Sequence, residues 1–74
     1  MDFRSRLSSS PDILLGKPVI KNTRVPVDLI LERLGDGMSI EEILEATPGI
    51  EREDILACIS YSSQVISRES LLAS

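Results

Sequence analysis

Aliphatic residues in the middle of the chain repeat at the spacing of an α-helix. Four of them occupy positions i, i+3, i+4 and i+7 of one helical face: Val27, Ile30, Leu31 and Leu34. Pro26 suits the start of such a helix, and Gly35 suits its end. The pattern therefore predicts a first helix over residues 27–35.

Two further helices are predicted after a polar turn. Ser39 and Glu42 have the spacing of a capping box, in which each side chain binds the backbone N–H of the other residue, and they predict a helix over 40–47. A Pro-Gly pair ends that helix. Carboxylates crowd the start of a third helix, predicted over 52–66, where the helix dipole favours negative charge. The side chains expected along one face of this third helix are Ile55, Leu56, Ile59, Ser63 and Ile66.

The segment before the first helix reads as extended chain. Two prolines oppose a helix there, and the residues between them are mostly β-branched or polar. We predict two short strands, at 19–20 and around Val25, joined by a tight turn in which Asn22 takes a positive φ angle. Residues 1–12 have loop composition and are expected to form a flexible N-terminal tail.

Together these elements predict a single domain over residues 13–66. Its fold class is mainly α, a three-helix bundle of the helix-turn-helix type with a short N-terminal β-hairpin. Residues 67–74 are expected to form a C-terminal tail or to extend the third helix. Leu71 and Leu72 continue the apolar pattern there, so this end of the chain is a candidate for a dimer interface.

A chain of 74 residues holds only a small core, and small domains usually need a further staple. Cys58 is the only cysteine and there is no histidine, which excludes an intrachain disulfide and leaves no ordinary zinc site. No metal or other cofactor is therefore expected. A partner chain is the remaining staple, so we expect a homo-oligomer, most simply a two-fold dimer.

The sequence shows neither a membrane span nor a secretory signal. No apolar run approaches the ~20 residues that a transmembrane helix needs, and the first ten residues are polar with two arginines. A lone cysteine also fits a reducing compartment. We expect a cytoplasmic protein with no membrane partner.

Several stretches resemble one family of small prokaryotic proteins, the domain of unknown function 433 family. The resemblance lies in Ser10–Val27, with its Gly-Lys-Pro-Val-Ile and Thr-Arg-Val-Pro-Val runs, in Gly37–Leu44 and in Glu53–Ala57, and it spans roughly residues 8–62. It implies a homeodomain-like three-helix fold with a short N-terminal β element. It also implies an antitoxin-like role beside a toxin that resembles a PIN-type ribonuclease, with no catalytic residues. One departure is Asn22, where the family usually has glycine.

Charge is unevenly spread, with a net +3 over residues 1–24 and −7 over 25–74. The candidates for nucleic-acid binding are therefore basic side chains near the hairpin, together with one on the third helix: Lys17, Lys21, Arg24 and Arg52. Solvated lysines that protect an edge strand are the simpler interpretation of the hairpin group. For Arg24 we favour a structural role, with its guanidinium holding a carboxylate or backbone carbonyls where the hairpin meets the first helix.

Acidic residues occupy the positions that would read DNA in a helix-turn-helix protein. The third helix begins with Glu51, Arg52, Glu53 and Asp54, and three acids oppose contact with phosphates. A purely structural helix pair is therefore favoured over groove reading. The wider acidic surface either docks on a basic partner, such as the substrate groove of a nuclease, or is a solvated face: Glu41, Glu42, Glu45, Glu51, Glu53 and Asp54.

We therefore expect a non-enzymatic interaction module, an antitoxin that binds and occludes a PIN-like ribonuclease. The residues expected at the partner or dimer interface are apolar or aromatic and lie near the C-terminus: Tyr61, Val65, Ile66, Leu71 and Leu72. The alternative is a helix-turn-helix DNA-binding regulator, which could act on its own operon. An enzyme is the weakest class, because without histidine nothing pairs a nucleophile with a base.

Overall fold

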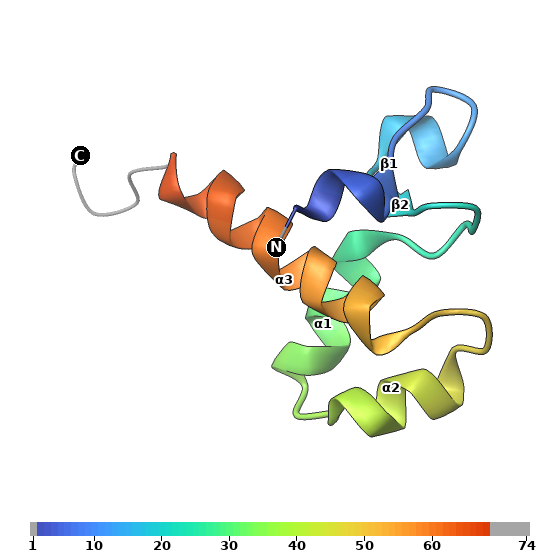
Figure 1. Ribbon diagram of the computed structural model, residues 1–74, viewed down its shortest axis with the longest axis vertical. Helices are drawn as coiled ribbons and strands as arrows, with labels where there is room; N and C mark the ends of the chain where they lie inside the picture. Colours follow the sequence, from blue (N-terminus) through green and yellow to red (C-terminus); the bar gives the residue numbers. More distant parts are fainter. Residues whose placement is uncertain (1, 69–74) are drawn as a thin grey trace.

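Three helices and a short pair of strands make up the computed structural model, which describes residues 2–68 (Figure 1). The helices are α1 (Val27–Gly35), α2 (Ile40–Ala46) and α3 (Arg52–Ser67). The predicted bounds hold for α1 and differ by one residue at the ends of α2 and α3. The predicted fold class, mainly α with three helices and a small N-terminal β element, is confirmed.

The strand pair differs from the predicted hairpin in its partner. Strand β2 (Val19–Ile20) runs antiparallel to β1 (Leu7–Ser8), with Leu7 opposite Ile20. The predicted return toward Val25 is present only as one hydrogen bond, from Ile20 N–H to the Val25 carbonyl (2.9 Å), and an isolated bridge between Val19 and Pro26. The turn itself is as predicted, because Asn22 has a φ of 65°. Residues 25–26 therefore border β2 without forming a strand.

The prediction that residues 1–12 form a tail is wrong for residues 3–8. A 3₁₀ turn, η1 (Phe3–Ser5), is capped by Asp2, whose carboxylate accepts the Arg4 N–H at 3.0 Å. After η1 comes β1, and Leu7 lies in the core. Two isolated apolar residues among polar neighbours carry no periodicity, so only their long-range partners identify this segment as structured. The domain therefore begins before residue 13.

The core lies between α1, α2, α3 and the strand pair. Its buried apolar members come from every one of these elements: Leu7, Val19, Ile20, Val27, Ile30, Ile43, Ile55, Ala57 and Cys58. The buried face of α3 is rotated from the predicted one, because Leu56 and Ile59 are exposed while Ala57 and Cys58 are fully buried. The reason is that α3 packs against η1 and β1 as well as α1 and α2. Burial raises the pKa of the Cys58 thiol to about 11, as expected for a small core side chain rather than a nucleophile.

The predicted capping box starts α2. The Glu42 N–H donates to Ser39 Oγ at 3.1 Å, and the Ser39 N–H donates to Glu42 Oε1 at 2.9 Å. Hydrogen bonding by Ser39 lowers the pKa of the Glu42 carboxyl, with the Ser39 backbone N–H contributing most. No helix within residues 2–68 is both long and apolar enough to span a bilayer. Leu71 and Leu72 lie outside the described residues, so their predicted interface role stays a prediction.

Candidate functional site

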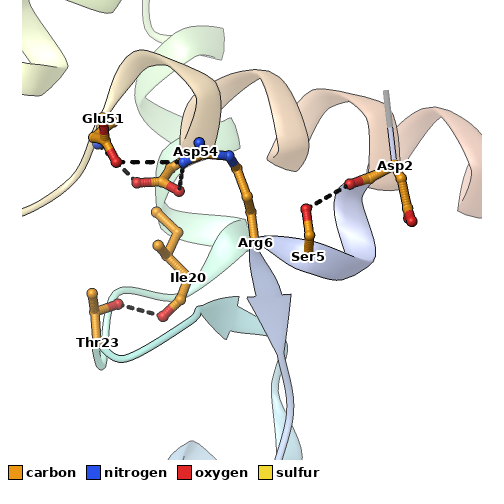
Figure 2. A network of polar contacts seen from close by, with 7 residues as sticks. All are labelled: Asp2, Ser5, Arg6, Ile20, Thr23, Glu51 and Asp54. Carbon is orange, nitrogen blue, oxygen red and sulfur yellow. Dashed lines mark hydrogen bonds and ion pairs between the residues drawn. The ribbon is translucent and has the colours of Figure 1, made fainter.

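A polar clamp joins the start of the chain to the first turn of α3 (Figure 2). Arg6 Nη1 lies 3.0 Å from Asp54 Oδ1 and 3.6 Å from Glu51 Oε1. Asp54 is nearly buried, and its second oxygen accepts the Glu51 N–H at 2.8 Å. The hydrogen bond to Asp54 is the main cause that raises the pKa of Arg6. Each polar group of the clamp therefore has a partner inside the domain, and the clamp holds the structure together.

A polar cleft of about 530 Å³ lies beside this clamp. Its walls come from the N-terminal segment, the β2 turn and the start of α3: Ser5, Arg6, Lys21, Asn22, Thr23, Gly49, Glu51 and Asp54. The hydroxyl of Thr23 donates to the Ile20 carbonyl at 2.7 Å (Figure 2), and Lys21 Nζ donates to the Arg4 carbonyl at 3.3 Å. Among the cations of the cleft, Arg6 is thus paired with carboxylates, whereas in the described structure Lys21 donates only to a backbone carbonyl and keeps its charge. Among residues 2–68, no cluster of three or more potential metal ligands occurs.

The four predicted nucleic-acid residues do not line one surface. Lys17 pairs with Asp28 on α1 at 3.1 Å, whereas Arg52 pairs with Glu41 on α2 at 3.4 Å. Lys21 lines the polar cleft.

Arg24 is exposed, and within the described part of the chain it has no hydrogen bond or ion pair. The structural role predicted for Arg24 is therefore wrong. The arginine that holds carboxylates is Arg6, which the sequence analysis placed in the tail. No local pattern marks Arg6 for this role, because its partner Asp54 is 48 positions away.

Acidic side chains gather on α2 and on the first turn of α3. A short turn of the chain joins these two helices (Figure 1). Glu41, Glu45 and Glu51 are exposed, and Glu42 is occupied by its capping box. Arg52 is the only basic residue among them, and it pairs with Glu41. The α2 part of this surface is therefore an acidic patch, whereas Glu51 and Asp54 belong to the clamp.

An apolar groove of about 290 Å³ runs between α1 and the C-terminal half of α3. It brings together three of the predicted interface residues, Tyr61, Val65 and Ile66. The remaining walls come from α1 and the segment before it: Lys17, Pro18, Val27, Asp28, Leu31 and Ser62. Tyr61 is held from the other side by the ring of Phe3, edge to face at 5.2 Å. The groove is open, since Ile66 keeps 65% of its surface exposed.

A strained loop was missed by the sequence analysis, which predicted extended chain there. The turn η2 (Leu14–Gly16) has three successive residues with positive φ: Leu14 at 48°, Leu15 at 58° and Gly16 at 88°. Leucine rarely adopts this backbone, because its Cβ approaches the carbonyl oxygen. Leu15 is 97% exposed. Gly16 was the one visible signal, because glycine is the usual residue at such positions.

The fold and these surfaces define a small helical domain that carries an acidic patch and an open apolar groove. The family described as "Protein of unknown function (DUF433)" matches residues 7–62, and the chain belongs to this family. The match includes β1 and ends at Ser62. Val65 and Ile66 lie beyond it, so membership alone says nothing about that end of α3.

Two further comparisons agree with this assignment. "Uncharacterized protein y4eO" of Sinorhizobium fredii (strain NBRC 101917 / NGR234) is 42% identical over 59 residues. These residues are 80% of this chain but 27% of the relative, so the chain spans about a quarter of that protein. The crystal structure of a DUF433 member protein from Anabaena variabilis ATCC 29413 superposes with a TM-score of 0.79 at 28% identity. The superposition covers 85% of this chain and 62% of the other.

Proposed function

We propose that this protein is a non-enzymatic interaction module of the cytoplasm, an antitoxin that binds a PIN-like ribonuclease and occludes its active region. The observation that carries the proposal is the acidic patch on α2 and the first turn of α3. Its α2 carboxylates are exposed, and within the described structure Arg52 is the cation that pairs with one of them. The resemblance to a family with antitoxin-like members supports the same function.

The charge of a ribonuclease groove explains why an acidic patch suits this role. A protein that binds RNA must neutralise phosphates, so its substrate groove is lined by lysine and arginine. Glu41 and Glu45 are exposed on α2, and although Glu41 pairs with Arg52, the surface keeps more acids than bases, so it is complementary to that groove. Complementary charge speeds encounter, and a patch seated over the groove excludes RNA.

The test uses the nuclease encoded beside this chain's own gene. Reversing charge in the patch, with Glu41→Lys and Glu45→Lys together, is expected to slow association roughly tenfold or more at low salt. RNA cleavage should reappear in mixtures that the natural chain silences. Glu32→Lys on α1 is the matched control, because Glu32 is an exposed carboxylate outside the patch. If a neighbouring nuclease is absent, or if both variants silence it equally, the proposal is wrong.

The exposed guanidinium of Arg24, unpaired in the described part of the chain, favours a second function, which is DNA binding. It is an exposed cation at the β2 turn, close in sequence to Lys21, and it has no partner within residues 2–68. The acidic start of α3 opposes insertion of that helix, so the turn would carry the contact. Gel shifts with the operator region should weaken steeply with salt and should be lost in the Lys21→Ala/Arg24→Ala variant. Failure to bind DNA at low salt removes this function.

A further inference from the structure

An open hollow of about 370 Å³ lies where η1 meets the last turns of α3. Figure 1 shows these two elements side by side, and they pack against each other. The hollow is lined by two aromatic rings, two guanidinium groups, an amide and an aliphatic side chain: Phe3, Arg4, Tyr61, Gln64, Val65 and Arg68. Within residues 2–68, no acidic side chain belongs to this lining. Its size and composition suit a small ligand that carries a flat ring and negative charge.

The aromatic part of the hollow contains both aromatic residues of the chain. The rings of Phe3 and Tyr61 meet edge to face, with their centroids 5.2 Å apart and their planes at 71°. Each ring packs against the core and is half-buried, so the fold holds it in place while part of it stays accessible. Fixed aromatic rings are the surfaces on which proteins stack unpaired bases. Packing between η1 and α3 explains the aromatic pair, but it does not explain the arginines beside it.

The two arginines of the hollow differ from the paired cations of the domain. Three cations elsewhere lie 3.0 to 3.4 Å from a carboxylate oxygen: Arg6, Lys17 and Arg52. By contrast, Arg4 Nη1 is 3.8 Å from Asp2 Oδ1, beyond hydrogen-bond distance, and its guanidinium lies over the Phe3 ring at 5.3 Å from the centroid. Arg68 is exposed and forms no ion pair within residues 2–68. Both guanidinium groups therefore keep donors for a phosphate.

The acidic surface of the domain is too far from this hollow to repel a phosphate strongly. Residues 55–67 contain no charged side chain, and the acids that begin α3 end at Asp54. From there to Gln64 the helix rises about 15 Å, which exceeds the Debye length of about 8 Å at physiological salt. Asp2, beside Arg4, is 69% exposed and offsets that charge only weakly. The lining itself is therefore positive, although the chain as a whole carries −4.

A nucleobase with its phosphates uses both parts of this hollow. The base stacks on an aromatic ring while guanidinium groups bind the phosphates beside it. An acidic peptide or a free phosphate would engage the arginines but leave the rings unused. Bases of a duplex stack on one another, so the base must belong to a single strand or a free nucleotide. Arg4 and Arg68 come from different elements, so the phosphates on the two sides of one base can each meet an arginine, which favours a strand.

We propose that this hollow binds one base of a single-stranded nucleic acid. The base stacks against the pair of Phe3 and Tyr61, and Arg4 and Arg68 hold the flanking phosphates. The amide of Gln64, in the same lining, binds an edge of the base. This activity goes beyond the functions proposed above, which use the acidic patch and the β2 turn. Family membership does not supply it, because the matched residues include Tyr61 but neither arginine.

The experiment measures the fluorescence anisotropy of a dye-labelled RNA of six adenosines as the full chain is added at low salt. We expect a dissociation constant on the order of 100 μM, as for other non-specific contacts with phosphates. Arg4→Ala and Arg68→Ala together should weaken binding at least about tenfold and lower the salt slope by about 1.4, since two phosphate contacts are lost. Arg24→Ala is the matched control, because Arg24 is an exposed arginine outside the hollow. It should change binding less than about twofold.

Tyr61→Leu tests the stacking, since leucine keeps an apolar side chain at the hollow but removes the ring. It should weaken binding at least about fivefold. Circular dichroism checks that each variant folds, and Phe3→Leu takes the place of Tyr61→Leu if that variant unfolds. Equal binding by a folded ring variant and the natural chain overturns the proposal.

Unlabelled competitors identify the ligand. AMP and a peptide of six glutamates should each compete at least about tenfold more weakly than the unlabelled RNA, because AMP lacks the second phosphate contact and the peptide lacks a base. Equal competition by AMP would assign the hollow to free nucleotides, and equal competition by the peptide would assign it to acidic chains. Either result overturns the proposal.

A natural chain that leaves the RNA unbound at roughly 1 mM also overturns the proposal, and so does equal weakening by Arg24→Ala and the double arginine variant. These measurements contain neither a nuclease nor an operator. Failure here is therefore separate from failure of the antitoxin proposal or of DNA binding by the β2 turn.

Discussion

The two halves of α3 belong to one continuous helix, but they have different surroundings. The first half, residues 52–58, supplies Ile55, Ala57 and Cys58 to the core and is fixed by Arg6 through Asp54. The second half, residues 59–67, touches the domain mainly through Tyr61 and leaves Ile66 in solvent. Helix formation is therefore decided by local sequence, whereas burial is decided by what reaches the helix from elsewhere. One helix can thus belong to the core at one end and lie open to solvent at the other.

The largest contrast between the halves should appear when the same side chain is removed from each. Ile55 is fully buried, so Ile55→Ala should lower the free energy of unfolding by about 2–5 kcal/mol. Ile66→Ala should lower it by less than about 0.5 kcal/mol when measured at a dilution where the chain is monomeric. Urea unfolding followed by circular dichroism gives both values. Equal losses would contradict the division of α3 into a core half and a surface half.

A second comparison separates the clamp from its acidic neighbours. Asp54→Ala removes the partner of Arg6 and of the Glu51 N–H, and it should cost about 1–3 kcal/mol of unfolding free energy. Glu53→Ala, one position earlier, should cost less than about 0.5 kcal/mol, because Glu53 makes no hydrogen bond or ion pair in the described structure. Thermal melts of the two variants measure the difference. Matching melting curves for the two variants would mean that the clamp does not stabilise the fold.

A third substitution should raise the free energy of unfolding instead of lowering it. Leu15→Gly removes an unfavourable left-handed leucine that packs on nothing, so it should raise the free energy of unfolding by up to about 1 kcal/mol, offset in part by the entropy of glycine in the unfolded chain. Leu29→Gly, within α1, is a control expected to lower it. Urea unfolding at low chain concentration measures both. A loss of stability for Leu15→Gly would mean that the leucine stabilises the fold.

The smallest expected effect is on the pH dependence of stability, through Glu42 in the first turn of α2. Because the pKa of Glu42 is lower in the folded chain than its ordinary value of 4.5, its ionised form stabilises the fold above that value. This contribution is lost as the pH falls through the lowered pKa. Glu42→Gln should therefore flatten the loss of stability between about pH 5 and pH 3. Melting temperatures across this range, compared with those of Glu45→Gln, measure the difference in slope.

The sequence was informative where structure depends on near neighbours. The periodic aliphatic residues of α1 predicted its bounds, and the Ser39–Glu42 spacing predicted a cap that the structure contains. Asn22 was predicted at positive φ because few other residues tolerate it.

The features that could not be predicted depend on distant partners. Arg6 finds Asp54 across 48 positions, and Leu7 pairs with Ile20, so a segment with no pattern of its own becomes part of the domain. The buried face of α3 was misplaced for the same reason, since α3 also packs against η1 and β1, which no local pattern shows, and Ala57 and Cys58 are buried. The groove residues Tyr61, Val65 and Ile66 were named from leftover apolar character, but the walls from α1 and Pro18 required the fold.

The clamp has a consequence for how the chain is made. Arg6 leaves the ribosome early, but the carboxylates that hold it are synthesised almost fifty residues later. Until the first turn of α3 has emerged, Arg6 lacks both of its carboxylate partners, and the nascent chain cannot complete its fold. A chain that stops before residue 54 should therefore lack the clamp and be more open to proteolysis.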